Sequence, residues 1–504
     1  MQAPPNAPNA PNAPNAPPNA PNALNAPTAP KAPKASNLLL VLLAAATLAG
    51  CPDANSPSSN RPEKAETWYR RAGREYKEAD FAEAHDSAQK ALAIVPEDPE
   101  VRTLAAEIAL TALDYAEVLR LLKGVKSTDS ARLRGRALWY KGDLEAAADE
   151  LDAMLNDPEV KDEWAKATSK LARRGAGRTP FTLKGSMLAA VEMVHVSPVA
   201  PYFVVPVEID GEAALAMIAS GSAEVVLDSS TRPEPSWVSL RFGDKFEVQD
   251  VPALAQDLSG ISKDLGAPIK ALLGVNLLRH VNATFDFAGH QFVVRSFVPP
   301  PPPAATRVDL RYVRGGGLVL RSAFGGEKGP KAALMVDTSR PFPVALDAEG
   351  WKKAGVDIAS LKPIAGDPEQ KLREGVVPLM RLGAFDVPRV QGIFGLPFTD
   401  LEKSMAVDLD GLLGAGLLYP YRCTFADGGR MLWIEDDTTS REMLGMSPNA
   451  SPNASPNASP NAPNAPNAAP NASPNAAPNA LPPAANVLPP AGPLDLRAPP
   501  APKK

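Results

Sequence analysis

The sequence predicts a multidomain α plus all-β protein, in which a stack of helical repeats is followed by two β lobes and flanked by disordered ends. Three observations support this prediction. Small and large apolar residues recur between residues 64 and 176 at a period of about 34 residues, which is typical of helical repeats. From Thr182 onward the chain changes to short β-rich runs separated by turn residues. Pro-Asn-Ala triplets occupy both ends of the chain.

The leader, residues 1–50, ends in the apolar run Leu38–Gly50. Thirteen apolar residues are too few to span a hydrocarbon core of about 30 Å as a helix, but they fit the apolar part of a signal peptide. Lys31 and Lys34 supply the positive charge that precedes such a run. We therefore expect a signal peptide.

The residues Leu48-Ala49-Gly50-Cys51 follow this run and resemble the bacterial lipobox. The resemblance implies that a diacylglycerol is attached to Cys51 and that the preceding segment is removed. The chain would then be a lipid-anchored membrane protein of the bacterial cell envelope, in either the inner or the outer membrane, with residues 51–63 as a tether. A plain secretory signal with a coincidental cysteine is the alternative.

The predicted repeat region covers residues 64–176. Its subpattern Asp80–Ala84 recurs as Asp114–Val118 and Asp143–Ala147, and Lys161–Arg174 is expected to form a capping helix. Small residues let paired helices approach, and large residues fill the gap to the next pair. The pattern resembles tetratricopeptide repeats, which implies a concave surface for peptides or partner proteins. A role as a spacer or dimerisation element is the alternative.

Two β lobes are predicted at residues 180–298 and 306–437, joined by a proline-rich linker at 299–305. In each lobe a β-rich run leads into a short turn, Ala219-Ser220-Gly221 in the first and Asp337-Thr338-Ser339 in the second. Partner strands are expected at Leu272–Arg279 and Gly411–Leu418. Their Gly274 and Gly414 are explained if each strand passes close to the turn without a side chain between them.

The segments Met217–Ser222 and Leu334–Ser339 resemble the apolar-apolar-Asp-Thr/Ser-Gly-Ala/Ser signature of retropepsin-type and pepsin-type aspartic peptidases. The resemblance implies a bilobal unit with a cleft between the lobes. By position, Ala219 replaces the first catalytic aspartate, and Asp337 is the second. Ser220 and Thr338 occupy positions whose hydroxyls, in the family, hydrogen-bond across the lobes. Gly221 is kept as a structural residue of the cleft, whereas Ser339 replaces the corresponding glycine.

The chemistry of such a site needs two carboxylates, one to activate a water and one to polarise the scissile carbonyl. With Ala219 at one position we favour a membrane-anchored pseudopeptidase that binds polypeptides through the repeats and the cleft without cutting them. One alternative is an aspartic endopeptidase that uses Asp337 in an unconventional or dimer-assembled site. Another is a repeat-based scaffold in which the β lobes are structural. Asp228, nine residues beyond Ala219, is expected to have a loop or capping role.

The remaining features narrow the possible functions. The tail, residues 447–504, is predicted to be extended and disordered because it has few groups to bury. A net charge of −5 without a basic stripe gives no signature of nucleic-acid binding. Two cysteines, Cys51 and Cys423, exclude a disulfide framework. The four histidines lack metal-ligand spacing, so the sequence predicts neither a metal nor another cofactor.

Overall fold

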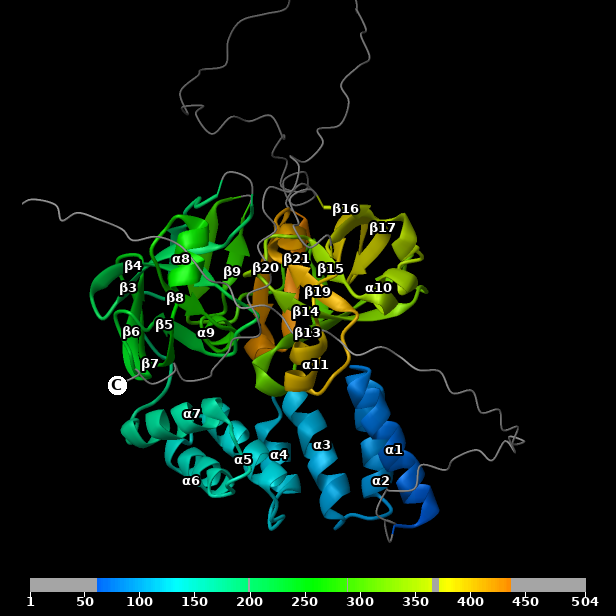
Figure 1. Cartoon of the computed structure of the whole chain (residues 1–504). Coiled ribbons are helices and arrows are strands. Elements are labelled where there is room, and N and C mark those ends of the chain that lie inside the picture. Colours follow the sequence, from blue (N-terminus) through cyan, green and yellow to red (C-terminus); the bar gives the residue numbers. More distant parts are fainter. Residues whose placement is uncertain (1–60, 198–199, 288, 365–370, 437–504) are drawn as a thin grey trace, which may run out of the picture. The chain divides into compact units, whose positions relative to one another are not determined.

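The computed structural model describes residues 61–197, 200–287, 289–364 and 371–436, which belong to one compact unit (Figure 1). A helical region is followed by β lobes, so the predicted mixed class is confirmed at that level. The predicted leader, the lipidation residue Cys51, most of the tether and the tail at 447–504 lie outside the described residues. Within the described part, no helix is long and apolar enough to cross a membrane.

The helical region contains seven helices that pack in consecutive pairs, α1 on α2, α3 on α4 and α5 on α6 (Figure 1). Gly135 in α5 illustrates how the small residues act, because an added Cβ there would lie 2.7 Å from the Leu151 side chain of α6. The helices are α1 (Glu63–Lys77), α2 (Phe81–Leu92), α3 (Pro99–Thr111), α4 (Tyr115–Leu121), α5 (Thr128–Lys141), α6 (Leu144–Leu155) and α7 (Glu163–Arg174).

The first lobe is built on a seven-stranded sheet in the order β1-β7-β5-β8-β4-β3-β6. The strand β4 enters the Ala219 turn and pairs in parallel with β8, with Met217 opposite Leu272. The elements are β1 (Thr182–Gly185), β3 (Val204–Ile209), β4 (Glu212–Ile218), β5 (Val225–Asp228), β6 (Ser236–Phe242), β7 (Phe246–Gln256), α8 (Ser259–Leu265), β8 (Ile269–Leu273) and α9 (Val275–His280).

The second lobe repeats this plan. Its sheet has the order β12-β13-β14-β19-β15-β18-β17-β16, and β14 enters the Asp337 turn and pairs in parallel with β19. The parallel pair β5/β7 of the first lobe has its counterpart in β15/β18. The elements are β12 (Arg311–Tyr312), η1 (Arg314–Gly316), β13 (Leu318–Phe324), β14 (Lys331–Asp337), β15 (Val344–Leu346), α10 (Ala348–Lys353), η2 (Ile358–Ser360), β16 (Lys362–Pro363), β17 (Arg373–Leu382), β18 (Phe385–Phe394), α11 (Thr399–Met405), β19 (Gly411–Gly414) and α12 (Ala415–Leu418).

A third sheet joins the two lobes, in the order β11-β21-β20-β9-β10-β2. The strand β9 of the first lobe pairs antiparallel with β20 of the second, and the hydroxyls of Thr284 and Thr424 hydrogen-bond across that pair at 2.7 Å. The lobes of one chain are therefore held together by backbone pairing. The elements are β2 (Leu188–Glu192), β9 (Thr284–Asp286), β10 (Gln291–Arg295), β11 (Thr306–Asp309), β20 (Tyr421–Ala426), η3 (Asp427–Gly429) and β21 (Met431–Asp436).

Two predicted strands are only half right. The runs expected to extend over Leu272–Arg279 and Gly411–Leu418 stop being strands at Gly274 and Gly414, and helices α9 and α12 follow directly. In the first lobe, the backbone N–H groups of Val275 and Asn276 donate to the carbonyls of Ser222 and Ala223, which turns the chain out of the sheet. An unbroken apolar run is equally compatible with a buried strand and a buried helix, so hydrophobicity could not separate them.

Candidate functional site

The two turns of the duplicated motif meet at the centre of the β unit. The Ser220 amide donates to the Thr338 hydroxyl at 3.0 Å, and the Thr338 amide donates to the Ser220 hydroxyl at 3.0 Å. Each hydroxyl also donates across the lobes, Ser220 to the carbonyl of Val336 at 3.0 Å and Thr338 to the carbonyl of Ile218 at 2.8 Å. Both residues are buried. This reciprocal set, which we call the turn clasp, fixes the two turns relative to each other.

Asp337 lies beside the turn clasp with its carboxylate engaged by its own loop. The amide and hydroxyl of Ser339 donate to Oδ1 at 3.0 and 2.6 Å, and Arg340 Nε lies 3.2 Å from Oδ2. Only 8% of Asp337 is exposed. Because Ser339 replaces a glycine of the family pattern, its hydroxyl is an added donor. The carboxylate is thus neutralised by an arginine and held by a serine.

Gly221 packs directly against this carboxylate. A Cβ at Gly221 would lie 2.6 Å from Cγ of Asp337, so a side chain there would displace Asp337. Gly274 and Gly414 have comparable positions behind the two turns. Their added Cβ atoms would lie 2.2 Å from the carbonyl oxygen of Glu224 and 2.1 Å from that of Phe342, respectively.

Ala219, at the position of the missing aspartate, is only 3% exposed. Its neighbours form an apolar cluster that includes Met217 of β4 and Leu272 of β8, together with Leu258 and Leu265 at the two ends of α8. A methyl group therefore occupies the place where the family has a carboxylate. A proton cannot be shared between Ala219 and Asp337, and the site has no second acid from that position to orient a water.

Short helices cover the faces of the sheets on which Ala219 and Asp337 lie. Residues two apart on a strand point to one side, so Met217 shares a face with Ala219 and Met335 shares a face with Asp337. The Met217 face packs against α8. The Met335 face belongs to a second apolar cluster that contains Phe398 and Met405, at the two ends of α11, and side chains of the helical region. Much of the surface beside the turns is thus filled by the chain's own apolar groups.

The odd-numbered helices pack onto both lobes. Lys77 of α1 pairs with Asp408 at 3.5 Å, and Glu107 of α3 pairs with Arg314 at 2.8 Å. In α7, the Leu171 carbonyl accepts a hydrogen bond from the Trp237 indole at 2.9 Å. The side of the helical region formed by these helices is therefore covered by the β lobes of the same chain.

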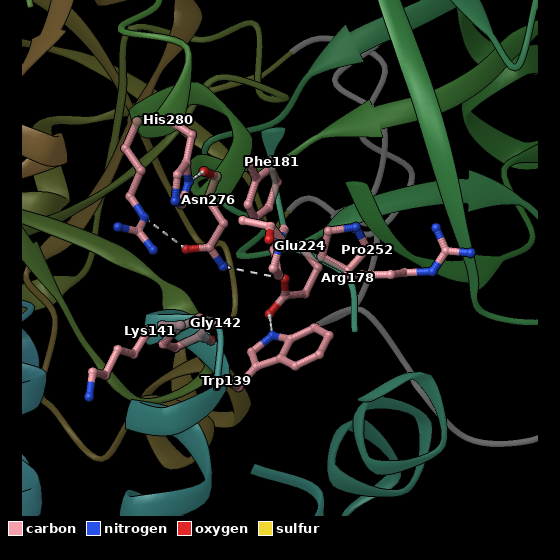
Figure 2. Close-up of a pocket in the computed structure, with 13 residues that line it drawn as sticks. Trp139, Lys141, Gly142, Arg178, Phe181, Glu224, Pro252, Asn276 and His280 are labelled. Carbon is pink, nitrogen blue, oxygen red and sulfur yellow. Dashed lines mark hydrogen bonds between the residues drawn. The ribbon is translucent and has the colours of Figure 1, made fainter. Parts of the chain in front are cut away.

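Glu224, five residues after Ala219, is the polar centre of the contact with the first lobe. The indoles of Trp139 and Trp164 donate to its Oε1 at 3.3 and 3.4 Å, and the Asn276 amide donates to Oε2 at 3.3 Å. Burial raises the pKa of Glu224, and these hydrogen bonds oppose that shift. Figure 2 shows Trp139 and Asn276 reaching the carboxyl from two sides, beside a cavity of about 150 Å³.

Sequence reasoning missed this constellation. Trp139 and Trp164 lie 85 and 60 residues from Glu224 along the chain, and only the packing of α5 and α7 on the first lobe brings them together. The isolated glutamate in Ser222-Ala223-Glu224-Val225 gives no motif by itself. A hint was available only in its position directly before the apolar residues Val225–Leu227, because a charged side chain beside a buried strand needs partners.

The other residues singled out from the sequence have structural surroundings. Asp228 accepts hydrogen bonds from Lys270 and Ser230; burial would raise its pKa, but these contacts lower it to about 2. Cys423 is buried as a free cysteine, and burial raises the pKa of its thiol. Among the residues that the structure describes, no group of three or more His, Cys, Asp or Glu side chains is arranged to hold a metal.

Comparisons with known proteins give partial similarities. No protein-family model and no curated protein sequence matches the chain. A solved retropepsin-like aspartic protease from Rickettsia conorii is 22% identical over 26% of this chain and 90% of that chain, with a TM-score of 0.20. The first TPR of Spaghetti (RPAP3), bound to the HSP90 peptide SRMEEVD, is 18% identical over 23% of this chain and 94% of that chain, with a TM-score of 0.21.

Proposed function

We propose that this chain is a lipid-anchored pseudopeptidase, a tetratricopeptide-like helical region joined to two retropepsin-like lobes that bind polypeptide or partner proteins in the bacterial cell envelope without cleaving them. The observation that carries the proposal is the state of Asp337. Its carboxylate is paired with Arg340 and hydrogen-bonded by Ser339, and Ala219 stands at the opposite catalytic position.

The chemistry supports inactivity. A peptidase dyad works because two adjacent carboxylates share one proton, and each needs the other to do so. Asp337 instead has the Arg340 guanidinium as its charged neighbour, at 3.2 Å. Loss of one member of an interdependent catalytic set typically lowers the rate by several orders of magnitude.

Packing bears on the two alternatives. A dimer-assembled peptidase would need the Asp337 lobes of two chains to meet, but β9 and β20 already join the two lobes within one chain, and the turn clasp connects Ser220 to Thr338. The second alternative is a repeat-based scaffold with structural lobes. It is favoured because α8 covers the sheet face on which Ala219 lies and α11 covers the face on which Asp337 lies. In that variant the partner surface is the exposed side of the even-numbered helices, such as His85, Gln89 and Lys90 of α2.

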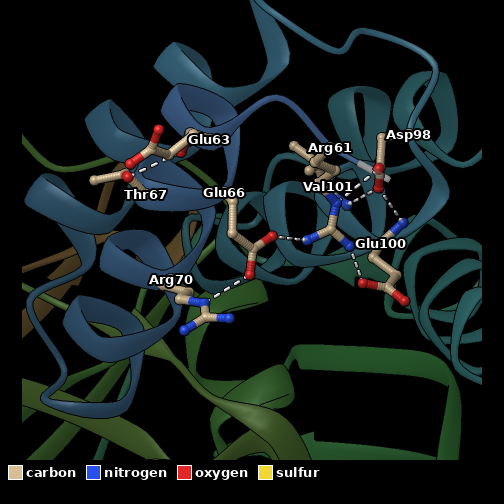
Figure 3. A network of polar contacts seen from close by, with 8 residues as sticks. All are labelled: Arg61, Glu63, Glu66, Thr67, Arg70, Asp98, Glu100 and Val101. Atoms are coloured by element: carbon tan, nitrogen blue, oxygen red, sulfur yellow. Dashed lines mark hydrogen bonds and ion pairs between the residues drawn. The ribbon is translucent and has the colours of Figure 1, made fainter. Parts of the chain in front are cut away.

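The proposed anchor at Cys51 is close in sequence to the first described residue, Arg61. The Arg61 guanidinium pairs with Asp98 at 2.7 Å, with Glu66 at 2.6 Å and with Glu100, so the start of the described chain is tied to both α1 and α3 (Figure 3). Residues 51–60 would reach at most about 35 Å when extended. A lipid at Cys51 would therefore keep the helical region close to the membrane surface.

Cleavage of a fluorogenic peptide library by the full chain from pH 3 to 7 tests the proposal, with Asp337→Asn as the matched control. We expect equal background signals from both proteins at every pH. Cleavage that disappears in Asp337→Asn would establish a working peptidase and overturn the pseudopeptidase assignment. The double variant Ala219→Asp with Ser339→Gly measures how far the site is from activity.

Binding and anchoring need their own readouts. Fluorescence anisotropy of a labelled unstructured polypeptide should show saturable binding that Asp337→Asn leaves unchanged, since the carboxylate is engaged by its own loop. Absence of saturable binding would rule out the proposed binding function.

For the anchor, we expect the chain to incorporate a labelled fatty acid in cells, and we expect Cys51→Ser to abolish this incorporation. A label retained in Cys51→Ser would refute attachment at that residue.

A further inference from the structure

The junction between α5 and the two lobes contains two adjoining cavities. The larger, of about 150 Å³, is lined by Glu224 and Arg279 of the first lobe, and the smaller, of about 20 Å³, is lined by Arg136 of α5 and Tyr312 of the second lobe. Both are lined by Tyr140 and Asn276, which places them side by side. Helical region, first lobe and second lobe thus all contribute to one polar site.

Arg136 is the most unusual residue of this junction. It is 6% exposed, its Nε has no hydrogen-bond partner in the part of the chain that the structure describes, and no ion pair is formed by it there. Its guanidinium lies 4.0 Å from the centre of the Trp164 ring, and Glu224 interacts with its charge without forming an ion pair with it. A buried, unpaired cation is costly, so an anion is the expected partner.

Arg279 and Tyr140 add further donors. The Nε of Arg279 donates to Asn276 Oδ1 at 3.1 Å, and within the described residues no carboxylate pairs with its guanidinium. The Tyr140 hydroxyl is buried without a hydrogen-bond partner in the same part of the chain. Both residues line the larger cavity, and Tyr140 also lines the smaller one beside Arg136.

The charge of the lining is strongly one-sided. Glu224 is the only acidic residue among the described residues that line either cavity, and its carboxyl oxygens already accept from Trp139, Trp164 and Asn276. The basic lining residues are Lys141, Arg178, Arg279, Arg136 and Arg314. Two of them form ion pairs, Arg178 with Asp250 and Arg314 with Glu107. The remaining three exceed the available negative charge.

We propose that this junction is a binding site for a small oxyanion, a carboxylate or a phosphate. The ion would be held in the larger cavity by Arg279 and the Tyr140 hydroxyl, with the positive charge of Arg136 in the adjoining smaller cavity. Guanidinium groups match the paired oxygens of both anions. The larger cavity admits such an ion with some water but is too small for a drug-sized ligand. The site does not involve Asp337, so it stands whether or not the chain is a pseudopeptidase.

Occupancy would couple the three parts of the protein. Arg136 belongs to α5, Arg279 follows β8 in the first lobe, and Tyr312 and Arg314 of the second lobe line the smaller cavity. An anion bound at Arg279 is also attracted by Arg136 only while the helical region stays docked on the lobes. The ligand should therefore stabilise the docked arrangement.

The test is a titration of the full chain with inorganic phosphate and, separately, with acetate, at constant ionic strength maintained by chloride. Tryptophan emission reports binding because Trp139 and Trp164 donate to Glu224 at the cavity. We expect saturation by at least one of the two anions, and the anion that saturates at lower concentration identifies the preferred class. Arg279→Gln should weaken that binding by about tenfold or more, since it removes a charge-assisted contact.

Arg307→Gln is the matched control, because it removes the same charge from an exposed residue of β11 that pairs with Asp309. It should leave the binding curve unchanged. Arg279→Lys separates a folding defect from a binding defect, since it keeps the charge and should retain part of the affinity. No saturation with either anion, or equal weakening by Arg279→Gln and Arg307→Gln, would overturn the proposal.

Discussion

Thr338→Val should lower the free energy of unfolding by about 2–6 kcal/mol, because it removes two of the four hydrogen bonds of the turn clasp. Thr338 is fully buried, and its hydroxyl accepts from the Ser220 amide at 3.0 Å and donates to the Ile218 carbonyl at 2.8 Å. Valine has nearly the same shape, so no cavity is created. The amide and the carbonyl would both remain buried without partners, at about 1–3 kcal/mol each.

The assay is urea-induced unfolding of the full chain, followed by tryptophan fluorescence. Thr424→Val is the matched control, since Thr424 is also buried and its hydroxyl also bonds across the lobes, to Thr284 at 2.7 Å. After that change the Thr284 hydroxyl keeps Arg295 Nη1 as a neighbour at 2.6 Å. The control should therefore cost only about 1 kcal/mol, the net value of an ordinary hydrogen bond.

A double-mutant cycle with Ser220→Ala completes the measurement. The Thr338 hydroxyl makes two of the four hydrogen bonds of the turn clasp, and the Ser220 hydroxyl makes the other two. Because each pair of bonds helps to hold the turns where the other pair can form, the second substitution should cost clearly less than it does alone. Additive costs, or a Thr338→Val cost no larger than that of Thr424→Val, would refute the view that the clasp holds the two lobes in place.

Three further perturbations follow from single contacts. Gly221→Ala should destabilise the chain by about 1–3 kcal/mol in the same urea assay, because its Cβ would lie 2.6 Å from Cγ of Asp337, whereas Gly260→Ala, with open space around it, should not. Burial raises the folded-state pKa of Glu224. The stability of the wild type relative to Glu224→Gln should therefore fall as pH rises above about 4.3. A stability difference that does not change with pH in urea titrations would contradict this. Burial also raises the pKa of Asp347, to about 6. The stability of the wild type relative to Asp347→Asn should therefore fall between about pH 4 and 6 and then level off. The urea midpoints of both proteins across that pH range test this prediction.

The division into a helical region and β lobes could be predicted because local sequence patterns indicate helices in one part of the chain and strands in the other. Recurring small residues such as Gly135 and the repeated Asp-aromatic start at Asp80 and Asp114 indicate helix pairs, and the β-rich runs after Thr182 indicate strands. The duplicated plan was also visible, since Ala219 and Asp337 each follow an apolar run and precede a second one. The predicted ends of β8 and β19 were wrong, because apolar residues continue beyond the glycine into a helix.

The contacts between the two regions could not be predicted in the same way. Trp139, Trp164 and Glu224 are each unremarkable in their local sequence, and their hydrogen bonds depend on docking of whole helices on a lobe. The same is true of the ion pair between Glu107 and Arg314, which are 207 residues apart. Period and composition describe how one element buries one face, but they carry no information about which elements meet.

The departures from the peptidase pattern form a consistent set. Without a carboxylate at position 219, Asp337 has no like-charged neighbour there, and its charge is balanced by Arg340 at 3.2 Å. Ser339, where the pattern has a glycine, donates its hydroxyl to the same carboxylate at 2.6 Å. Each change removes a requirement that kept the others in place. A residue type associated with catalysis is thereby used as a structural ligand of its own loop, directly against Gly221 of the other lobe. The Asp337 carboxylate therefore has a structural role where the two turns meet, whether or not it takes part in catalysis.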